Sequence, residues 1–252
     1  SGMVSVNIQT PNDKGLSNNH YSQFDVGSQG VILNNNRKAV ATQLAGFVDA
    51  NPFMARGEAT TILNQVNSSK ASILNGFVEV AGQKADVIIA NPNGLQINGA
   101  GFINAANVHL VSGTAQILDG RPSAYHVGTG AIVASGKLNA GHTDYTALIA
   151  KSMQLNDEIY AGKQLDVITG ENLINIQDGK PNQLSATGKQ ASSSQTNQTI
   201  NNTTQGVALD ISALGGMYAG SIRLIGTNQG LGVNNAGIIL STGNDGASPL
   251  SL

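Results

Sequence analysis

Histidine and carboxylate side chains are the residues of this chain whose types could support acid–base catalysis or metal binding. The chain has four histidines, 15 acidic residues and no cysteine. His20, His109 and His126 lie in unrelated sequence contexts, and only His142 has an acidic residue within two positions, Asp144. A metal or a general base needs several such groups converging on one place. The spacing therefore predicts no catalytic residue, no metal site and no cofactor, and indicates a polar turn at His142 and Asp144.

Two short motifs begin with the same Asn-Pro pair and are the most informative turn signals in the chain. They are Asn91-Pro92-Asn93-Gly94 and Asn51-Pro52-Phe53-Met54. In the first motif, proline presets φ, the asparagine side chain can accept from the backbone two residues on, and glycine fits the fourth position. It predicts a type I turn. The second motif keeps the Asn-Pro start but places bulky residues where Asn and Gly stand in the first.

The elements that must position these turns are short β-strands. Segments such as Phe77–Val80, Asp86–Ile89 and Leu95–Ile97 alternate with period two, and Gly or Asn-Gly separates them. Three longer segments share one pattern, a hydrophobic pair, small residues and an alternating stretch: 102–113, 159–170 and 217–226. Their separations suggest repeat units of roughly 19 or 20 residues, in the range of solenoid repeats.

Evenly spaced short strands fit a sandwich, a barrel or a solenoid, and two features favour the solenoid. The strands lack the two-residue Asn-Gly linkers that mark successive hairpins, and the repeats would stack identical positions in register. We therefore expect an all-β, parallel β-helix of about 11 rungs, roughly 50 Å long at the usual strand spacing. We expect Val87, Ile89, Leu165 and Val167 to point inward, and His109 to face outward from an alternating strand.

Composition is consistent with one folded domain over residues 1–252. The charged fraction is 11%, under half of the usual value of about 25%, while 40% of the residues are hydrophobic and only 4% aromatic. This balance argues against intrinsic disorder. The formal net charge is -2 and no basic stripe is present, so we expect no nucleic-acid partner. No apolar run is long enough for a transmembrane helix, and no charged start precedes an apolar stretch as in a signal peptide.

One segment breaks the pattern of strands. Residues 178–205 are dominated by Ser, Thr, Asn and Gln and carry little apolar content. We expect this polar excursion, and residues 181–205 above all, to lie outside the β-helix wall and to be the first site cut by a broad protease.

An ordered series of segments resembles two-partner secretion domains, the N-terminal domains of filamentous haemagglutinin-like adhesins and contact-dependent growth inhibition toxins. The segments that carry the resemblance include Val6–Asn12, Gly15–Asn19, Gly30–Asn35, Ala85–Leu95, Gly101–Asn104, Leu165–Gly170 and Gly215–Gly220. The resemblance covers essentially the whole chain outside the polar excursion. The family carries an Asn-Pro-Asn-Leu and an Asn-Pro-Asn-Gly motif. Residues 91–94 match the second fully, and residues 51–54 match only the Asn-Pro of the first. Some members carry a cysteine pair that this chain lacks.

The resemblance implies a right-handed parallel β-helix with an N-terminal cap and extra-helical strands. It implies recognition in the periplasm by the soluble modules of a dedicated outer-membrane β-barrel transporter, with export and folding starting at this domain. The transporter-recognition or structural motif residues would be Asn51, Pro52, Asn91, Pro92, Asn93 and Gly94. The resemblance also implies a monomeric domain that is secreted or displayed on the bacterial surface, and no enzyme.

Two alternatives stay open at this point. A carbohydrate-active β-helix enzyme would need several Asp ligands for calcium and a Lys or Arg base in one groove, whereas the acids here are scattered along the sequence. A glycan-binding adhesin module is the other alternative. The sequence leaves open whether the parent protein is an adhesin, a cytolysin or a growth-inhibition toxin.

Overall fold

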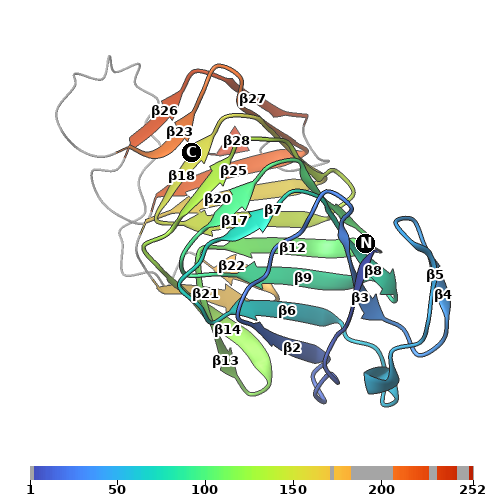
Figure 1. Cartoon of the computed structure of the whole chain (residues 1–252). Coiled ribbons are helices and arrows are strands. Elements are labelled where there is room, and N and C mark those ends of the chain that lie inside the picture. The colour runs from blue at the N-terminus through green and yellow to red at the C-terminus, as the bar shows by residue number, and fades with distance from the viewer. Residues whose placement is uncertain (1–2, 171–172, 183–206, 227–231, 243–249, 252) are drawn as a thin grey trace.

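Three parallel β-sheets form the body of the molecule (Figure 1). The computed structural model describes residues 3–170, 173–182, 207–226, 232–242 and 250–251. Sheet A contains, in spatial order, β1 (Val4–Asn7), β3 (Val31–Asn35), β8 (Phe77–Gly82), β11 (Ala100–Ile103), β16 (Leu138–Ala140), β19 (Glu158–Ala161), β24 (Gly216–Ala219) and β27 (Ile238–Ser241). Sheet B contains β2 (Leu16–Tyr21), β6 (Thr61–Val66), β9 (Ala85–Ala90), β12 (Ala105–Val111), β17 (Tyr145–Ala150), β20 (Gln164–Thr169), β25 (Ser221–Gly226) and β28 (Leu250–Ser251). Sheet C contains β7 (Ser72–Leu74), β10 (Leu95–Ile97), β15 (Ala131–Ala134), β18 (Ser152–Leu155), β23 (Val207–Ile211) and β26 (Gly232–Asn235).

The chain visits the sheets in the repeating order A, B, C, so each circuit forms one rung of a parallel β-helix. Rung one consists of β1, β2 and a single bridge from Val26 to Leu74. The following rungs each take the next strand of each sheet, and rung eight consists of β27 and β28. The all-β fold with stacked parallel sheets, expected from the sequence, is confirmed.

The expected number of rungs and the expected number of residues per rung were wrong. Sheets A and B hold eight strands each in the part of the chain that is described, against the expected eleven. Thr146 pairs with Leu165, a step of 19 residues, but Val108 pairs with Thr146 after 38 and Leu165 with Ile222 after 57. The long steps arise because outward insertions interrupt two of the rungs, and the pairing in the sheet continues in register beyond them.

The interior of the β-helix is an aliphatic core. Val87, Ile89, Leu165 and Val167, predicted to point inward, are at most 1% exposed and belong to one cluster that extends through the stack. Inward residues of sheet B stack in register from rung to rung. One such line contains Ile62, Val87, Val108, Thr146, Leu165 and Ile222, and the next contains Asn64, Ile89, Leu110, Leu148, Val167 and Leu224.

Two hairpins from different rungs pair to form a four-stranded antiparallel sheet outside the β-helix, here called the outer sheet. It consists of β13 (Gly113–Leu118), β14 (Arg121–Val127), β21 (Leu173–Gln177) and β22 (Lys180–Asn182). Both hairpins turn at Asp-Gly pairs with positive φ, 52° and 75° at Asp119 and Gly120 and 52° and 74° at Asp178 and Gly179. Positive φ at both central residues defines the type I′ turn that matches strand twist. These are extra-helical strands of the kind that the family resemblance implied, but the local sequence pattern did not locate them.

A smaller insertion leaves rung two between sheets A and B. It comprises the hairpin of β4 (Val40–Thr42) and β5 (Gly46–Val48) and the short 3-10 helix η1 (Pro52–Met54). Glu79 of β8 fixes this hairpin: its side chain is 4% exposed, and its carboxylate oxygens accept from the backbone N–H groups of Gln43 and Leu44 at 2.8 and 2.9 Å. A buried carboxylate is therefore compensated by two backbone donors at the turn.

The polar excursion begins inside the outer sheet. Lys180–Asn182 form β22 and pair with β21, and residues 183–206, on which the protease-sensitivity expectation falls, lie outside the described residues. No helix among the described residues is long and apolar enough to cross a membrane.

Candidate functional site

Asn51 of the first Asn-Pro motif is a buried structural anchor. It caps η1, and its side chain is 2% exposed. The amide nitrogen Nδ2 donates to the carbonyl oxygens of Ile8 at 3.0 Å and Asn34 at 2.9 Å, while Oδ1 accepts from the Phe53 N–H at 2.9 Å. The backbone N–H of Met54 also donates to the Asn51 carbonyl at 3.1 Å. One side chain thereby holds the turn to two earlier segments of the chain.

Asn91 of the second motif makes the same pattern of contacts. Its side chain is fully buried, Nδ2 donates to the Lys70 carbonyl at 2.8 Å and to Ser72 Oγ at 3.0 Å, and Oδ1 accepts from the Asn93 N–H at 3.0 Å. The Gly94 N–H donates to the Asn91 carbonyl at 3.1 Å, as a β-turn requires. Gly94 has φ +106°, and a Cβ there would lie 2.6 Å from the Ala131 carbonyl oxygen. Glycine is needed at this position for both reasons.

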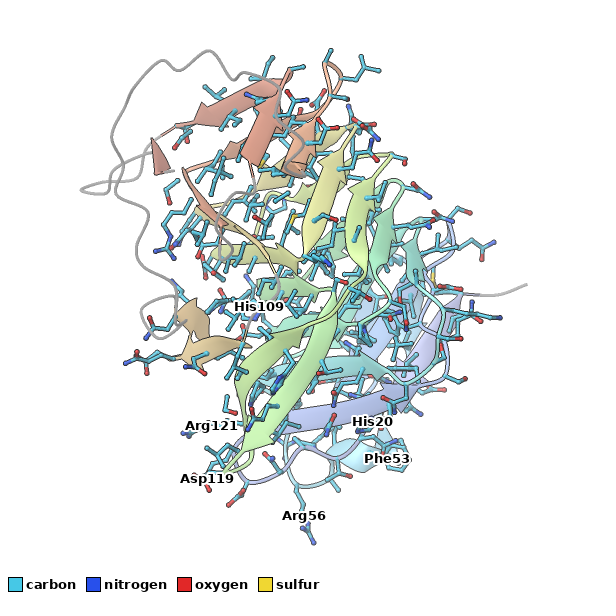
Figure 2. The ribbon with its side chains drawn as sticks, turned by 90° about the vertical axis from the view of Figure 1, so that its left-hand side faces the viewer. His20, Phe53, Arg56, His109, Asp119 and Arg121 are labelled. Atoms are coloured by element: carbon cyan, nitrogen blue, oxygen red, sulfur yellow. The ribbon has the colours of Figure 1, made fainter. Side chains whose placement is uncertain are left out.

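The two motifs share local geometry but lie at different corners of the β-helix. Asn51 precedes a strand of sheet B, β6, and Asn91 connects β9 of sheet B to β10 of sheet C. The structure thus does not join them into one site. Their exposed members differ: Pro52 is exposed and Phe53 is 44% exposed, whereas Pro92 and Asn93 are half-buried. Figure 2 shows Phe53 at one end of the molecule, the same end as Arg56.

His142 and Asp144 lie at the corner between sheets A and B, where they line an open groove of about 460 Å³. Asp144 pairs with Lys163 at 2.9 Å, and that ammonium group lowers the pKa of the Asp144 carboxyl. Tyr160 and Tyr218 stack beside it with ring centroids 4.8 Å apart. Both His142 and Asp144 are exposed, which agrees with the polar turn expected from the sequence.

A buried polar cluster that was not predicted from the sequence lies between sheet B and the outer sheet. His109 faces outward as predicted, but the outer sheet covers it, so its side chain is only 4% exposed. Its Nδ1 lies 2.6 Å from the Tyr125 hydroxyl of β14. Burial lowers the His109 pKa from 6.5 to about 4, although the nearby Asp166 charge acts in the opposite direction. Within the described part of the chain, His109 Nε2 has no hydrogen-bond partner.

Asp166 is the fully buried carboxylate of this cluster. It accepts from the Tyr145 hydroxyl at 2.6 Å and from Arg223 Nε at 2.8 Å and Nη2 at 2.5 Å. Burial and the adjacent Asp166 charge raise the Tyr145 pKa, and the carboxylate contact raises the Arg223 pKa. The bidentate ion pair compensates the buried charge. Since every acidic and basic group here is engaged in a structural contact, the cluster has the character of packing between two sheets.

Metal-ligating groups do not gather elsewhere in the described residues. No group of three or more His, Cys, Asp or Glu side chains there could hold a metal ion. Among the predicted motif residues, the structure places the two asparagines in buried contacts and leaves part of each turn accessible. The two Asn-Pro motifs therefore form two separate loops of defined shape at corners of the β-helix.

Solved structures include a close match to this architecture. The structure described as the filamentous hemagglutinin secretion domain aligns with a TM-score of 0.80 and 25% sequence identity, covering 100% of this chain and 95% of that one. The agreement extends over the complete chain, which supports the β-helix assignment.

Relatives of this chain are much longer proteins. It is 47% identical over 246 residues to Toxin CdiA of Yersinia pestis, covering 97% of this chain and 7% of that protein. It is 39% identical to the 16S rRNA endonuclease CdiA of Enterobacter cloacae, with 93% and 7% covered, and 38% identical to tRNA nuclease CdiA-2 of Burkholderia pseudomallei, with 97% and 8% covered. The family model described as the TPS secretion domain matches residues 1–248. The chain therefore belongs to the TPS secretion domain family.

Proposed function

We propose that this chain is the secretion-targeting domain of a large exported bacterial protein, and that an outer-membrane transporter of the two-partner type recognises it through its periplasmic modules. The observation that carries the proposal is the match of residues 1–248 to the TPS secretion domain family. The chain spans 7% or 8% of the relatives named above, as suits a targeting module attached to a much larger cargo. The domain would reach the cell surface or the medium by way of the periplasm.

Recognition of the chain before it folds fits the architecture. In the folded stack, each internal strand of sheets A, B and C is paired on both sides, as β12 is with β9 and β17. Those backbone groups are free only in the nascent chain, where an extended segment can add to the edge of a partner sheet. With a charged fraction of 11%, the interaction would depend little on long-range electrostatics and only modestly on salt.

The Asn-Pro motifs would act mainly by shaping loops. The support is the set of buried amide contacts of Asn51 and Asn91 with earlier rungs, and the tight approach of Gly94 to Ala131. Pro52, Pro92 and Asn93 remain accessible at the surface of these loops. Direct contact of these residues with the transporter is the alternative to loop shaping.

The parent protein would be a contact-dependent growth inhibition toxin. The support is the 47% identity to Toxin CdiA of Yersinia pestis and the similarity to two proteins named as CdiA nucleases. Any such nuclease activity would reside in parts of the parent outside this chain, because the relatives extend far beyond the segment that matches it.

Deletion of residues 1–100 from the full-length parent tests the secretion role. The truncated and intact proteins are produced with the cognate transporter, and surface export is measured beside an in-frame deletion of equal length downstream of residue 252. We expect at least a tenfold loss of export for the first deletion and little loss for the second. Undiminished export of the protein lacking residues 1–100 would refute the secretion-signal proposal.

A further inference from the structure

The outer face of sheet B and the inner face of the outer sheet enclose a second apolar core, separate from the lumen of the β-helix. The outer sheet contributes Tyr125 and Ile174, both at most 1% exposed. The residues of sheet B in this core come from successive rungs along the stack. They are Leu16 of rung one, Leu63 of rung two, Ile88 and Ala90 of rung three, Val111 of rung four, Tyr145, Ala147 and Ile149 of rung five and Ile168 of rung six, with Ile225 of rung seven packed against them.

Specific contacts fix the outer sheet at both ends of this surface. Asn12 Nδ2, in the loop before β2, donates to the Gly120 carbonyl at the tip of the β13–β14 hairpin at 2.9 Å. Figure 2 shows this hairpin extending from the level of His109 to its tip near Asp119 and Arg121. Toward the other end, Lys180 of β22 lies 5.0 Å from the ring centroid of Tyr145 in rung five. The hairpin that leaves rung four thus returns to the N-terminal rung, and the hairpin from rung six joins it.

Stacked-repeat proteins normally contact only their nearest neighbours, so their stability is a sum of local terms and their ends can unfold separately. The outer sheet departs from this rule because the apolar core that it shares with sheet B contains residues of rungs one to six, with a residue of rung seven packed against them. Its hairpins also contact the loop before β2, rung four and rung five directly. We propose that the outer sheet makes these rungs unfold as a single cooperative unit. Without it, the N-terminal and C-terminal rungs would open independently of the middle of the stack.

Assembly of the outer sheet depends on pairing between two strands that are far apart in the sequence. Ala124, Tyr125 and His126 of β14 pair with Asn175, Ile174 and Leu173 of β21. Each hairpin has its own Asp-Gly turn and is local in sequence, so it can form early. Pairing of β14 with β21 needs the chain through residue 177, so the outer sheet can be completed only after both hairpins are present.

Two matched variants of β21 test the proposal. Ile174→Asp places a charge in the second core and should detach the outer sheet. Leu173→Asp makes the same change at the adjacent residue, which is 42% exposed. Native-state amide exchange is measured for the complete domain at β2 and β6, at β12 and β17, and at β25. In the unaltered domain and in Leu173→Asp, we expect the slow amides of these strands to share one protection factor, the intrinsic exchange rate of each amide divided by its observed rate. In Ile174→Asp, the protection factors of amides in β2 and β25 should be at least tenfold lower than those in β12.

A milder variant covers the case in which Ile174→Asp does not fold. Asn12→Asp keeps the Oδ1 acceptor for the backbone N–H groups of Lys14 and Leu16 and removes the Nδ2 donor to the Gly120 carbonyl at the hairpin tip. Amides of β2 should then exchange several-fold faster while those of β20 keep their rate. If the amides of β2 and β25 keep their rates in a folded Ile174→Asp domain while only the outer sheet exchanges faster, the cooperative role is overturned. The same holds if β2 and β25 already exchange independently in the unaltered domain.

Discussion

Buried asparagine side chains make many of the hydrogen bonds that hold neighbouring segments of this protein together. Asn35 donates to the carbonyl oxygens of Ala59 and Gln83 and accepts from the Ala59 N–H, with its side chain fully buried. Asn51 and Asn91 have the same pattern with other partners. An amide offers two donors and an acceptor without the desolvation penalty of an ion. This explains how a chain with few charges satisfies the backbone groups at its corners.

Asn91→Ala is expected to lower the free energy of unfolding by about 1–3 kcal/mol, because it leaves the Lys70 carbonyl and the Asn93 N–H without their partner in a buried turn. Chemical denaturation measures the change, and Asn98→Ala at the exposed next turn should change it by less than roughly 0.5 kcal/mol. If loop shaping is the role of the motif, export should fall only as far as stability falls. Lost export at an unchanged melting temperature would instead indicate direct contact with the transporter.

Some of the residue-level structure was predictable, and the limits have physical causes. The turn at Asn91 follows from local residue preferences, so the sequence predicted it. The partners of its Nδ2 lie about a full rung earlier, at Lys70 and Ser72, and local preferences contain no information about them. For His109, alternation predicted the outward direction correctly. Its burial depends on strands from residues 113–127 and 173–177, which no local pattern around His109 indicates.

The buried His109 should make the domain less stable in mild acid. Its pKa is about 4 in the folded state against 6.5 ordinarily, so between these values the unfolded chain binds more protons. The free energy of unfolding should therefore increase with pH in this window, by up to about 1.4 kcal/mol per unit. The rings of Tyr125 and Tyr145 lie against the imidazole, and the charge that acts on it is that of Asp166. Denaturation at pH 4, 5, 6 and 7 measures the slope.

The variant His109→Asn separates the contribution of His109 to the pH dependence of stability from that of other titrating groups. Asp86, whose pKa burial raises, acts in the opposite direction, but it is common to both proteins. We expect His109→Asn to have a shallower dependence of stability on pH from 4 to 6.5 than the unaltered domain. Equal slopes would show that His109 stays neutral in the unfolded chain as well or is protonated in both states.

At the scale of the elements, the predictions from the sequence differ from the structure mainly at the insertions. The Asp-Gly pairs at 119–120 and 178–179 are strong hairpin signals, and both form the type I′ turn that such pairs favour. They were not predicted because the intervals between the repeats were taken as whole numbers of rungs. The pairing of one hairpin with the other could not have been found locally, since β14 leaves rung four and β21 leaves rung six, with a complete rung between them in the sequence.

The β4–β5 hairpin should loosen when Glu79, a buried residue that anchors its turn, is changed. Glu79→Gln replaces a carboxylate oxygen by an NH₂ group that faces a backbone N–H donor, and so should cost about 1–3 kcal/mol. Limited proteolysis should then cut within Val40–Val48 faster than in the unaltered domain, while the rest of the stack stays protected. Asp13→Asn, at an exposed carboxylate, is the control. Unchanged cleavage in Glu79→Gln would mean that other contacts hold the hairpin.

At the scale of the whole molecule, a regular β-helix is combined with irregular rung lengths. Alternation of residues such as Val87 and Ile89 was enough to predict the inward face, because a filled lumen favours apolar side chains at every second position. The rung length was not predictable from the average period. An insertion at a corner lengthens the chain between two stacked positions, and does so without disturbing their register, as for Leu165 and Ile222.

Substitutions that shorten inward-facing side chains in different rungs should therefore lower the free energy of unfolding by similar amounts. Leu110→Ala in rung four and Leu165→Ala in rung six each remove a fully buried side chain, and each is expected to lower the free energy of unfolding by about 2–5 kcal/mol through lost contacts and the cavity left behind. Urea denaturation should show one transition with an unchanged m-value, because the same surface is exposed on unfolding. Leu118→Ala, at a residue that is 61% exposed, should be nearly neutral. A second transition in either lumenal variant, or a cost near that of Leu118→Ala, would contradict a continuous lumenal core.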